Sequence, residues 1–172
     1  PAEFRVKFVT TKGDVILALH RDWAPLGVDR FYNLVKGGFF TQIAIFRVVP
    51  GFVAQFGIHG RPVVADTWKE ARIADDPVKE SNRRGTIVFA TAGPNTRTTQ
   101  LFINYSDNAR LDSMGFAPLG EVVEGMDIVD GINAQYGEKP DQGALTKQGN
   151  AYLEKNYPEL DYILSAELLE KI

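Results

Sequence analysis

The sequence lacks cysteine and has only two histidines, His20 and His59, among its 172 residues. Disulfides, thiolate nucleophiles and Cys-ligated zinc are therefore excluded, and few imidazoles are left to bind any other metal. The motifs of serine hydrolases, P-loop proteins, zinc proteases and dinucleotide-binding proteins are also missing. We therefore expect an activity that needs neither a metal nor another cofactor.

Long hydrophobic runs and an excess of charge of one sign are absent as well. No stretch approaches the ~18 continuous apolar residues of a transmembrane helix, so membrane insertion is not expected. The formal net charge is -3 with both signs mixed along the chain, which gives no basic surface for a nucleic-acid partner. The chain begins at Pro1 without Met, so we expect a trimmed N-terminus. A periplasmic, a secreted and a cytoplasmic location all stay open.

The sequence does contain many short apolar runs of alternating polarity, separated by Gly and Pro, and this pattern predicts strands. The first twenty residues predict a hairpin with its turn at 11–14. Residues 43–57 predict two strands bent at Pro50-Gly51, where proline removes a donor from the ladder. Further strands are predicted at 86–90, 100–104 and 118–123.

Helical spacing is found in fewer places. One helix is predicted from Pro25 to the Gly37-Gly38 pair, and a second, short one after Gly125. The polar segment 58–84 predicts a long irregular surface connection in which Asp75-Asp76 would be a solvated pair.

The last forty residues differ from the rest of the chain. Residues 142–156 predict a helix, although Gly143 and Gly149 weaken the pattern. Residues 161–172 predict a short amphipathic ending.

About seven or eight short strands with few helices predict an all-β fold, either one closed barrel or a sandwich. The length suits a single domain over 1–172. We expect this domain to be a monomer.

Two long motifs point to a family. Residues 46–57 read FRVVPGFVAQFG, and residues 85–120 contain AGPNT at 92–96 followed by QLFI at 100–103. Together they resemble the cyclophilin signature, which includes R-x-x-P-G-F-x-x-Q and A-G-P-N-T followed by Q-x-F-I. The resemblance covers roughly residues 4–133, which implies a core of about 4–133 and a C-terminal extension at 134–172. It implies an eight-stranded antiparallel barrel capped by two helices, and peptidyl-prolyl cis-trans isomerase activity on X-Pro bonds of polypeptides during protein folding.

The resemblance also implies which residues act. It assigns the catalytic arginine to Arg47 and the polar group beside it to Gln55, which either orients Arg47 or binds a substrate carbonyl. Phe116 either closes a wall of the proline pocket or packs in the core. The full set of substrate-binding residues that it implies is Phe52, Val53, Ala90, Thr91, Gln100, Phe102, Leu111 and Phe116. No metal ligand is among them.

The chemistry suits these residue types. Amide resonance opposes rotation of a peptide bond by about 18–20 kcal/mol, and X-Pro isomers exchange over tens to hundreds of seconds. A catalyst needs no nucleophile, only groups that favour the twisted amide over the planar one. A guanidinium that donates to the pyramidal proline nitrogen does so, while apolar side chains grip the pyrrolidine ring.

The sequence departs from the family pattern at several of these positions. Val53 stands where many cyclophilins carry Met, and Thr91 where they carry Asn. Arg110 replaces a Trp that is associated with strong cyclosporin binding, which puts binding of that drug in doubt. Two other functions stay open at this point: a non-catalytic module or chaperone that binds proline-containing segments in the same groove, and a barrel that encloses a small ligand.

Overall fold

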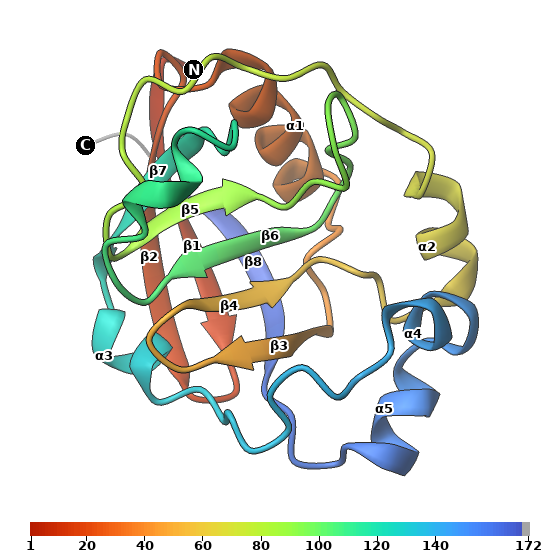
Figure 1. Cartoon of the computed structure of the whole chain (residues 1–172). Helices are drawn as coiled ribbons and strands as arrows, with labels where there is room; N and C mark the ends of the chain where they lie inside the picture. Colours follow the sequence, from red (N-terminus) through yellow and green to blue (C-terminus); the bar gives the residue numbers. More distant parts are fainter. Residues whose placement is uncertain (170–172) are drawn as a thin grey trace.

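The computed structural model describes residues 1–169 and shows a closed barrel of eight antiparallel strands (Figure 1). The strands are β1 (Glu3–Thr10), β2 (Gly13–His20), β3 (Ile43–Val49), β4 (Val53–Phe56), β5 (Thr86–Phe89), β6 (Leu101–Asn104), β7 (Pro118–Glu124) and β8 (Tyr162–Leu169). Around the barrel they follow the order β1, β2, β7, β5, β6, β4, β3 and β8, and β8 pairs with β1 to close it. The predicted all-β barrel is confirmed.

Aromatic side chains fill the interior of the barrel. The Phe8 ring lies 6.1 Å from that of Phe31, 5.4 Å from that of Phe40 and 5.7 Å from that of Phe56, measured between centroids. The space that remains among the described residues around Phe8 is about 10 Å³, which is at most the room of a single water. The barrel is therefore a packed core and does not enclose a small ligand.

Two helices cover the barrel, as expected. The longer one, α1 (Pro25–Lys36), buries Val28, Phe31 and Leu34 against the core and ends at Gly37. The short α3 (Met126–Asp130) buries Val129 in the same core. The two helices lie at opposite sides of the barrel in Figure 1. No helix among residues 1–169 has both the length and the apolar composition needed to cross a membrane.

Two segments differ from the prediction: the connection 58–84, which was expected to be irregular, and residues 142–156, which were expected to form one helix. The connection 58–84 contains a helix, α2 (Pro62–Trp68), which starts at a proline suited to the first helical turn. The helix expected over 142–156 is two helices, α4 (Gln142–Gln148) and α5 (Asn150–Asn156). They part at Gly149, whose φ of 72° favours glycine and where an added Cβ would clash with the Gly60 carbonyl oxygen.

The C-terminal segment belongs to the barrel. Residues 162–169 form β8, which pairs with both β1 and β3, whereas an amphipathic ending was expected there. The boundary expected at residue 133 is corrected accordingly, because the segment beyond it supplies one of the barrel strands. The last three residues of the predicted ending, 170–172, lie outside the described residues.

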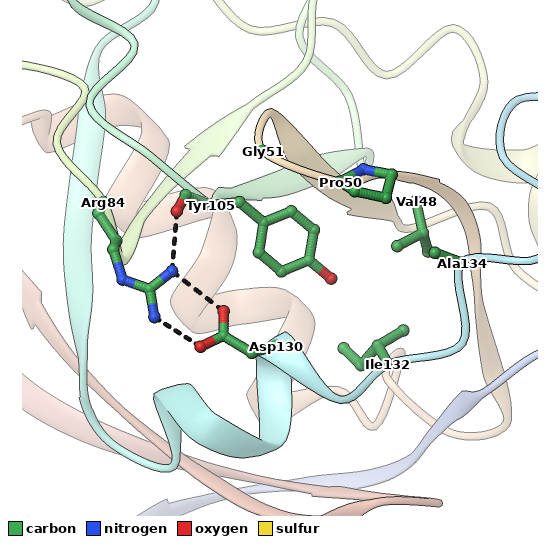
Figure 2. Close-up of a pocket in the computed structure, with 8 residues that line it drawn as sticks. All are labelled: Val48, Pro50, Gly51, Arg84, Tyr105, Asp130, Ile132 and Ala134. Carbon is green, nitrogen blue, oxygen red and sulfur yellow. Dashed lines mark hydrogen bonds and ion pairs between the residues drawn. The ribbon is translucent and has the colours of Figure 1, made fainter.

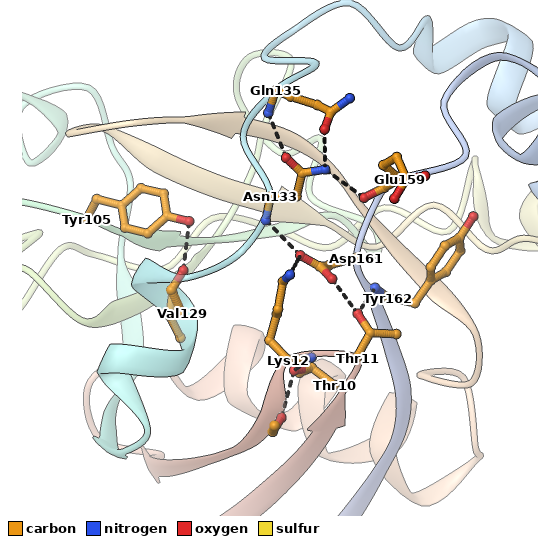
Figure 3. Close-up of polar contacts among 11 residues, drawn as sticks. Thr10, Thr11, Lys12, Tyr105, Val129, Asn133, Gln135, Glu159, Asp161 and Tyr162 are labelled. Atoms are coloured by element: carbon orange, nitrogen blue, oxygen red, sulfur yellow. Dashed lines mark hydrogen bonds and ion pairs between the residues drawn. The ribbon is translucent and has the colours of Figure 1, made fainter.

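Asp161 fixes the entry into β8 (Figure 3). Its side chain is buried and accepts hydrogen bonds from the Thr11 hydroxyl at 2.7 Å and from the backbone N–H of Asn133 at 2.7 Å. Its own carbonyl accepts from the N–H of Ile45 at 2.9 Å. One residue thus joins the β1–β2 turn, the segment after α3 and strand β3.

Asp76 has the same kind of role at α1. It was expected in a solvated pair, yet its side chain is only 3% exposed. Its carboxylate accepts from the N–H groups of Leu26 at 3.1 Å and Gly27 at 2.8 Å in the first turn of α1. It also pairs with the buried guanidinium of Arg97 at 3.0 Å. The helix terminus and the cation together explain why a carboxylate is buried there.

We predict that Asp76→Ala lowers the free energy of unfolding by about 3–5 kcal/mol, because it leaves the Arg97 cation buried without a counter-charge. Urea denaturation measures the effect. The neighbouring exposed Asp75 provides the control, since Asp75→Ala removes the same charge at the surface and should cost less than about 1 kcal/mol. Equal losses in the two variants would contradict the structural role of Asp76.

His59 makes stability depend on pH. Its side chain is buried beside the Phe39 ring, and its Nδ1 accepts from the N–H of Arg61 at 3.0 Å. Burial, with the nearby Arg61 charge, lowers the pKa of His59 below its ordinary 6.5. The unfolded chain therefore binds a proton at a higher pH than the folded protein does.

We predict that stability falls as the pH drops through about 6.5 towards the lower folded-state pKa of His59, where the loss is complete. His59→Asn removes the titration and keeps an acceptor for the Arg61 N–H. The urea midpoint of this variant should fall less than that of the native protein between about pH 7.5 and pH 5.5. If the urea midpoints of the two proteins fell by the same amount with pH, His59 would not be the group responsible.

Candidate active site

The polar groups of the site form a row across the outer face of the barrel. Arg47 on β3 lies opposite Gln55 on β4, and Gln55 lies opposite Phe102 on β6. Residues directly opposite each other on antiparallel strands point to the same face, so the pairing brings these side chains together. A bulge between Ile45 and Arg47 sets this register.

Hydrogen bonds link the row. The Nη1 group of Arg47 donates to Oε1 of Gln55 at 3.0 Å, and Nε2 of Gln55 donates to Oε1 of Gln100 at 2.9 Å. Gln55 is buried, whereas 28% of the Arg47 side chain is exposed. The buried Gln55 amide therefore holds the Arg47 guanidinium on one side, and the guanidinium is partly exposed to solvent. Gln55 thus contacts both Arg47 and Gln100, and its role in catalysis stays a prediction.

A carboxylate that the sequence reasoning missed also binds Arg47. Glu138 accepts at its Oε1 from Nε of Arg47 at 2.8 Å and from Nη2 of the same guanidinium. Glu138 could not be predicted from the two motifs, because it lies 91 residues beyond Arg47 in the sequence and outside both of them. Only the path of the chain after α3 brings it to the site.

An apolar pocket lies beside the polar row. Val53, Phe102 and Leu111 form one buried cluster together with Val88. Phe52 and Phe116 pack on this cluster and are partly exposed, and the Phe116 ring meets that of Phe102 edge-on at 5.7 Å. Phe116 therefore stands in the wall of this cluster and outside the barrel core. The side chains predicted to bind the proline ring are brought together on the outer face.

Buried asparagines support this pocket from beneath. Asn108 donates to the Phe52 carbonyl at 3.0 Å and to the Asn104 side chain at 2.8 Å. Asn82 donates to the Phe116 carbonyl at 2.9 Å and to Asp112 at 2.7 Å. These bonds fix the backbone on both sides of the pocket mouth.

Asp112 is the charged member of this network. Partial burial by itself favours the neutral acid, but hydrogen bonds from Asn82 and Ser81 to the carboxylate outweigh it and lower the pKa of Asp112. The carboxylate therefore stays ionised and keeps the 3-10 turn Ala109–Leu111 in place against Asn82. The polar Asn104 within the apolar run of β6 is the one sign of this network in the sequence.

A second pocket of about 330 Å³ opens next to the polar row. Gln55 and Gln100 line one part of it, and Ala90 and Thr91 line another. The backbone N–H of Ala90 donates to the Gln100 carbonyl at 2.9 Å, which fixes their spacing. All ten predicted site residues thus lie along one surface, in the row, the apolar pocket or this second pocket.

Two guanidinium groups flank the mouth of the apolar pocket. The Cζ atom of Arg110 lies 4.9 Å from the centroid of the Phe52 ring, and that of Arg47 lies 5.8 Å from it. Both distances fall within the range of cation–π attraction.

A further hollow of about 270 Å³ lies apart from these residues (Figure 2). The Pro50-Gly51 bend and the Tyr105 ring form its walls, and Arg84 pairs with Asp130 at its edge. The Tyr105 hydroxyl donates to the Val129 carbonyl at 2.9 Å, and burial raises the pKa of Tyr105 to about 12. None of the predicted site residues lines this hollow.

The described part of the chain contains no cluster of three or more His, Asp or Glu side chains arranged to hold a metal ion. The site is instead built from donors, amides and apolar surface.

Comparison with known proteins agrees with this site. Residues 5–150 match the family model described as cyclophilin type peptidyl-prolyl cis-trans isomerase/CLD. Peptidyl-prolyl cis-trans isomerase A of Dickeya dadantii is 37% identical over 139 residues, which cover 74% of this chain and 70% of that protein. Peptidyl-prolyl cis-trans isomerase B of Escherichia coli is 29% identical over 175 residues, covering 94% and 96%.

A solved structure shows the same fold. The cyclophilin type peptidyl-prolyl cis-trans isomerase of Cryptosporidium parvum superposes with a TM-score of 0.71 at 20% identity, over 99% of each chain. The same protein has been crystallised in the presence of the dipeptide Ala-Pro.

The family match spans most of the chain, and the arginine, glutamine and apolar pocket implied by the motifs lie on one surface of the barrel. The chain therefore belongs to the cyclophilin-type peptidyl-prolyl cis-trans isomerases, enzymes that interconvert the cis and trans forms of X-Pro bonds.

Proposed function

We propose that Arg47 is the catalytic group of this isomerase and that the reaction takes place between the polar row and the apolar pocket. The observation that carries the proposal is the placement of the Arg47 guanidinium, held by Gln55 at 3.0 Å, next to the cluster of Val53, Phe102 and Leu111. A proline ring in that cluster brings its nitrogen towards the guanidinium.

The guanidinium acts on the twisted amide. In the planar peptide the nitrogen lone pair is delocalised into the carbonyl, and it returns to the nitrogen as the bond rotates. An N–H of Arg47 that donates to this lone pair stabilises the twisted state more than either planar isomer. This difference lowers the barrier and leaves the equilibrium between the isomers unchanged.

The remaining residues hold the substrate while one part of it turns. Phe52, Phe102 and Leu111 exclude water from the pyrrolidine ring and keep it fixed. Gln100 offers its amide to the substrate backbone, and the pocket that contains Ala90 and Thr91 receives residues that precede the proline. With the ring held, rotation is confined to the residues before it.

The proposed substrates are proline-containing polypeptides that reach this open surface. A crystal of the Cryptosporidium parvum relative was obtained with Ala-Pro, which supports a short X-Pro segment as the minimal ligand. We further propose that the domain acts as a monomer and that Arg110, a charged side chain in place of the family tryptophan, weakens cyclosporin binding. Catalysis, as opposed to binding alone, is supported by the guanidinium that remains at position 47.

We predict that Arg47→Ala lowers kcat/KM by about 10²–10³-fold, the cost of removing one donor to the transition state. Arg47→Lys should have a kcat/KM close to that of Arg47→Ala, because an ammonium cannot keep the bond to Gln55 and also reach the proline nitrogen. A coupled assay on Ala-Pro peptides and NMR exchange spectroscopy both measure the rate.

The matched control for this test is Arg5→Ala, which removes an exposed arginine from β1 on another part of the barrel. It should keep native turnover. The thermal unfolding midpoints of the variants at positions 5 and 47 should both stay near that of the native protein. Native turnover in Arg47→Ala would overturn the assignment of Arg47.

A further inference from the structure

The contact between Arg47 and Glu138 is an ion pair with one well-held partner and one exposed one. The Glu138 side chain is 61% exposed and the Arg47 side chain 28%. An exposed ion pair of this kind contributes little to stability. Because the ion pair involves the guanidinium proposed to be catalytic, we consider its effect on the orientation of Arg47.

The chain on both sides of Glu138 is anchored. The carbonyl of Gly137 accepts from the N–H of Val48 at 3.2 Å, directly beside Arg47 on β3. The carbonyl of Lys139 accepts from the Tyr157 hydroxyl at 3.1 Å. Glu138 is thus presented to Arg47 by a backbone that is fixed one residue before it and one residue after it.

The C-terminal segment supplies most of this anchoring. Tyr136 and Tyr157 stack edge-on with ring centroids 5.1 Å apart, and the Tyr136 hydroxyl accepts from the N–H of Glu159 at 3.2 Å. Further back, Asn133 donates to the Asp161 carboxylate and to the Glu159 carbonyl, as Figure 3 shows. The path from α3 to Glu138 is therefore held by residues 157–161.

The arrangement leaves the guanidinium with free donors. Arg47 has five N–H groups, of which Glu138 takes one on Nε and one on Nη2, and Gln55 takes one on Nη1. One N–H on each of Nη1 and Nη2 remains without a partner among residues 1–169. Two partners on different edges fix the plane of the group, so these two donors keep a constant direction.

We propose that Glu138 is a positioning residue that, together with Gln55, fixes the plane of the Arg47 guanidinium for catalysis. The proposal rests on the catalytic role of Arg47. An arginine side chain that is held on one edge only keeps rotamer freedom, which must be lost each time the guanidinium is ordered for turnover. Glu138 orders it in advance, and residues 157–161 hold the chain before and after Glu138 in place.

The test compares two substitutions at position 138. Glu138→Ala removes the acceptor and should lower kcat by about two- to fivefold with little change in KM, in line with the weight of an exposed pair. Glu138→Gln keeps an acceptor oxygen and should retain most of the native kcat. Glu154→Ala, which removes an exposed carboxylate from α5, is the control for loss of charge in the same segment.

A second measurement reports on the guanidinium itself. The Nε–H of Arg47 in the native protein and in Glu138→Gln should exchange slowly with water by NMR, and it should exchange fast in Glu138→Ala. In an Arg47→Ala background, Glu138→Ala should have no further effect on the rate.

The outcomes separate the two proposals. A kcat that is unchanged or raised in Glu138→Ala, while Arg47→Ala is inactive, overturns the positioning role alone. Full activity in Arg47→Ala overturns the catalytic assignment and the positioning role with it. Equal losses in Glu138→Ala and Glu154→Ala would point to a general effect of charge and would also overturn the role of Glu138.

Discussion

The two-residue period of the strands is the constraint on which both the core and the active surface depend. On β4, Ala54 and Phe56 pack into the barrel while Val53 and Gln55 face outward. The four residues of β4 therefore contribute two side chains to the barrel core and two to the candidate active site. A slip of one residue would turn Gln55 into the apolar core, so the packing that stabilises the barrel also sets the register of the site.

This coupling explains how much of the site could be read from the sequence. Alternation predicted most of the strands, and the family resemblance pointed to Arg47, Gln55 and Phe102, which the pairing of β3, β4 and β6 places side by side. Phe116 was left undecided between wall and core, since its place depends on how the loop after Leu111 folds back. In the structure the Phe116 ring packs edge-on against Phe102, outside the barrel core, and its role in binding proline stays a prediction.

Long-range contacts of polar side chains are what the sequence could not provide. Asp76 was expected to be solvated, because neither the α1 terminus nor Arg97 is near it in the chain. The β8 strand was missed for a different reason: Ile163 is its only buried residue, so the alternation of apolar and polar residues that marks the other strands is weak. Glu138 carries no motif at all. In each case the contacting residue lies far away in the sequence, and the two come together only in the closed barrel.

Prolyl isomerisation makes such contacts matter because the enzyme forms and breaks no covalent bond. The whole acceleration must come from donors and apolar walls that are already in the right direction when the amide twists. Gln55 meets this need through the β3–β4 ladder, which cannot loosen without opening the barrel. Glu138 meets it through the C-terminal segment, which is anchored at Asp161 where β8 enters the sheet. Asp161 thus bonds both the β1–β2 turn beside the closing strand and the segment that leads to Glu138, so barrel closure and the order of the site share one anchor.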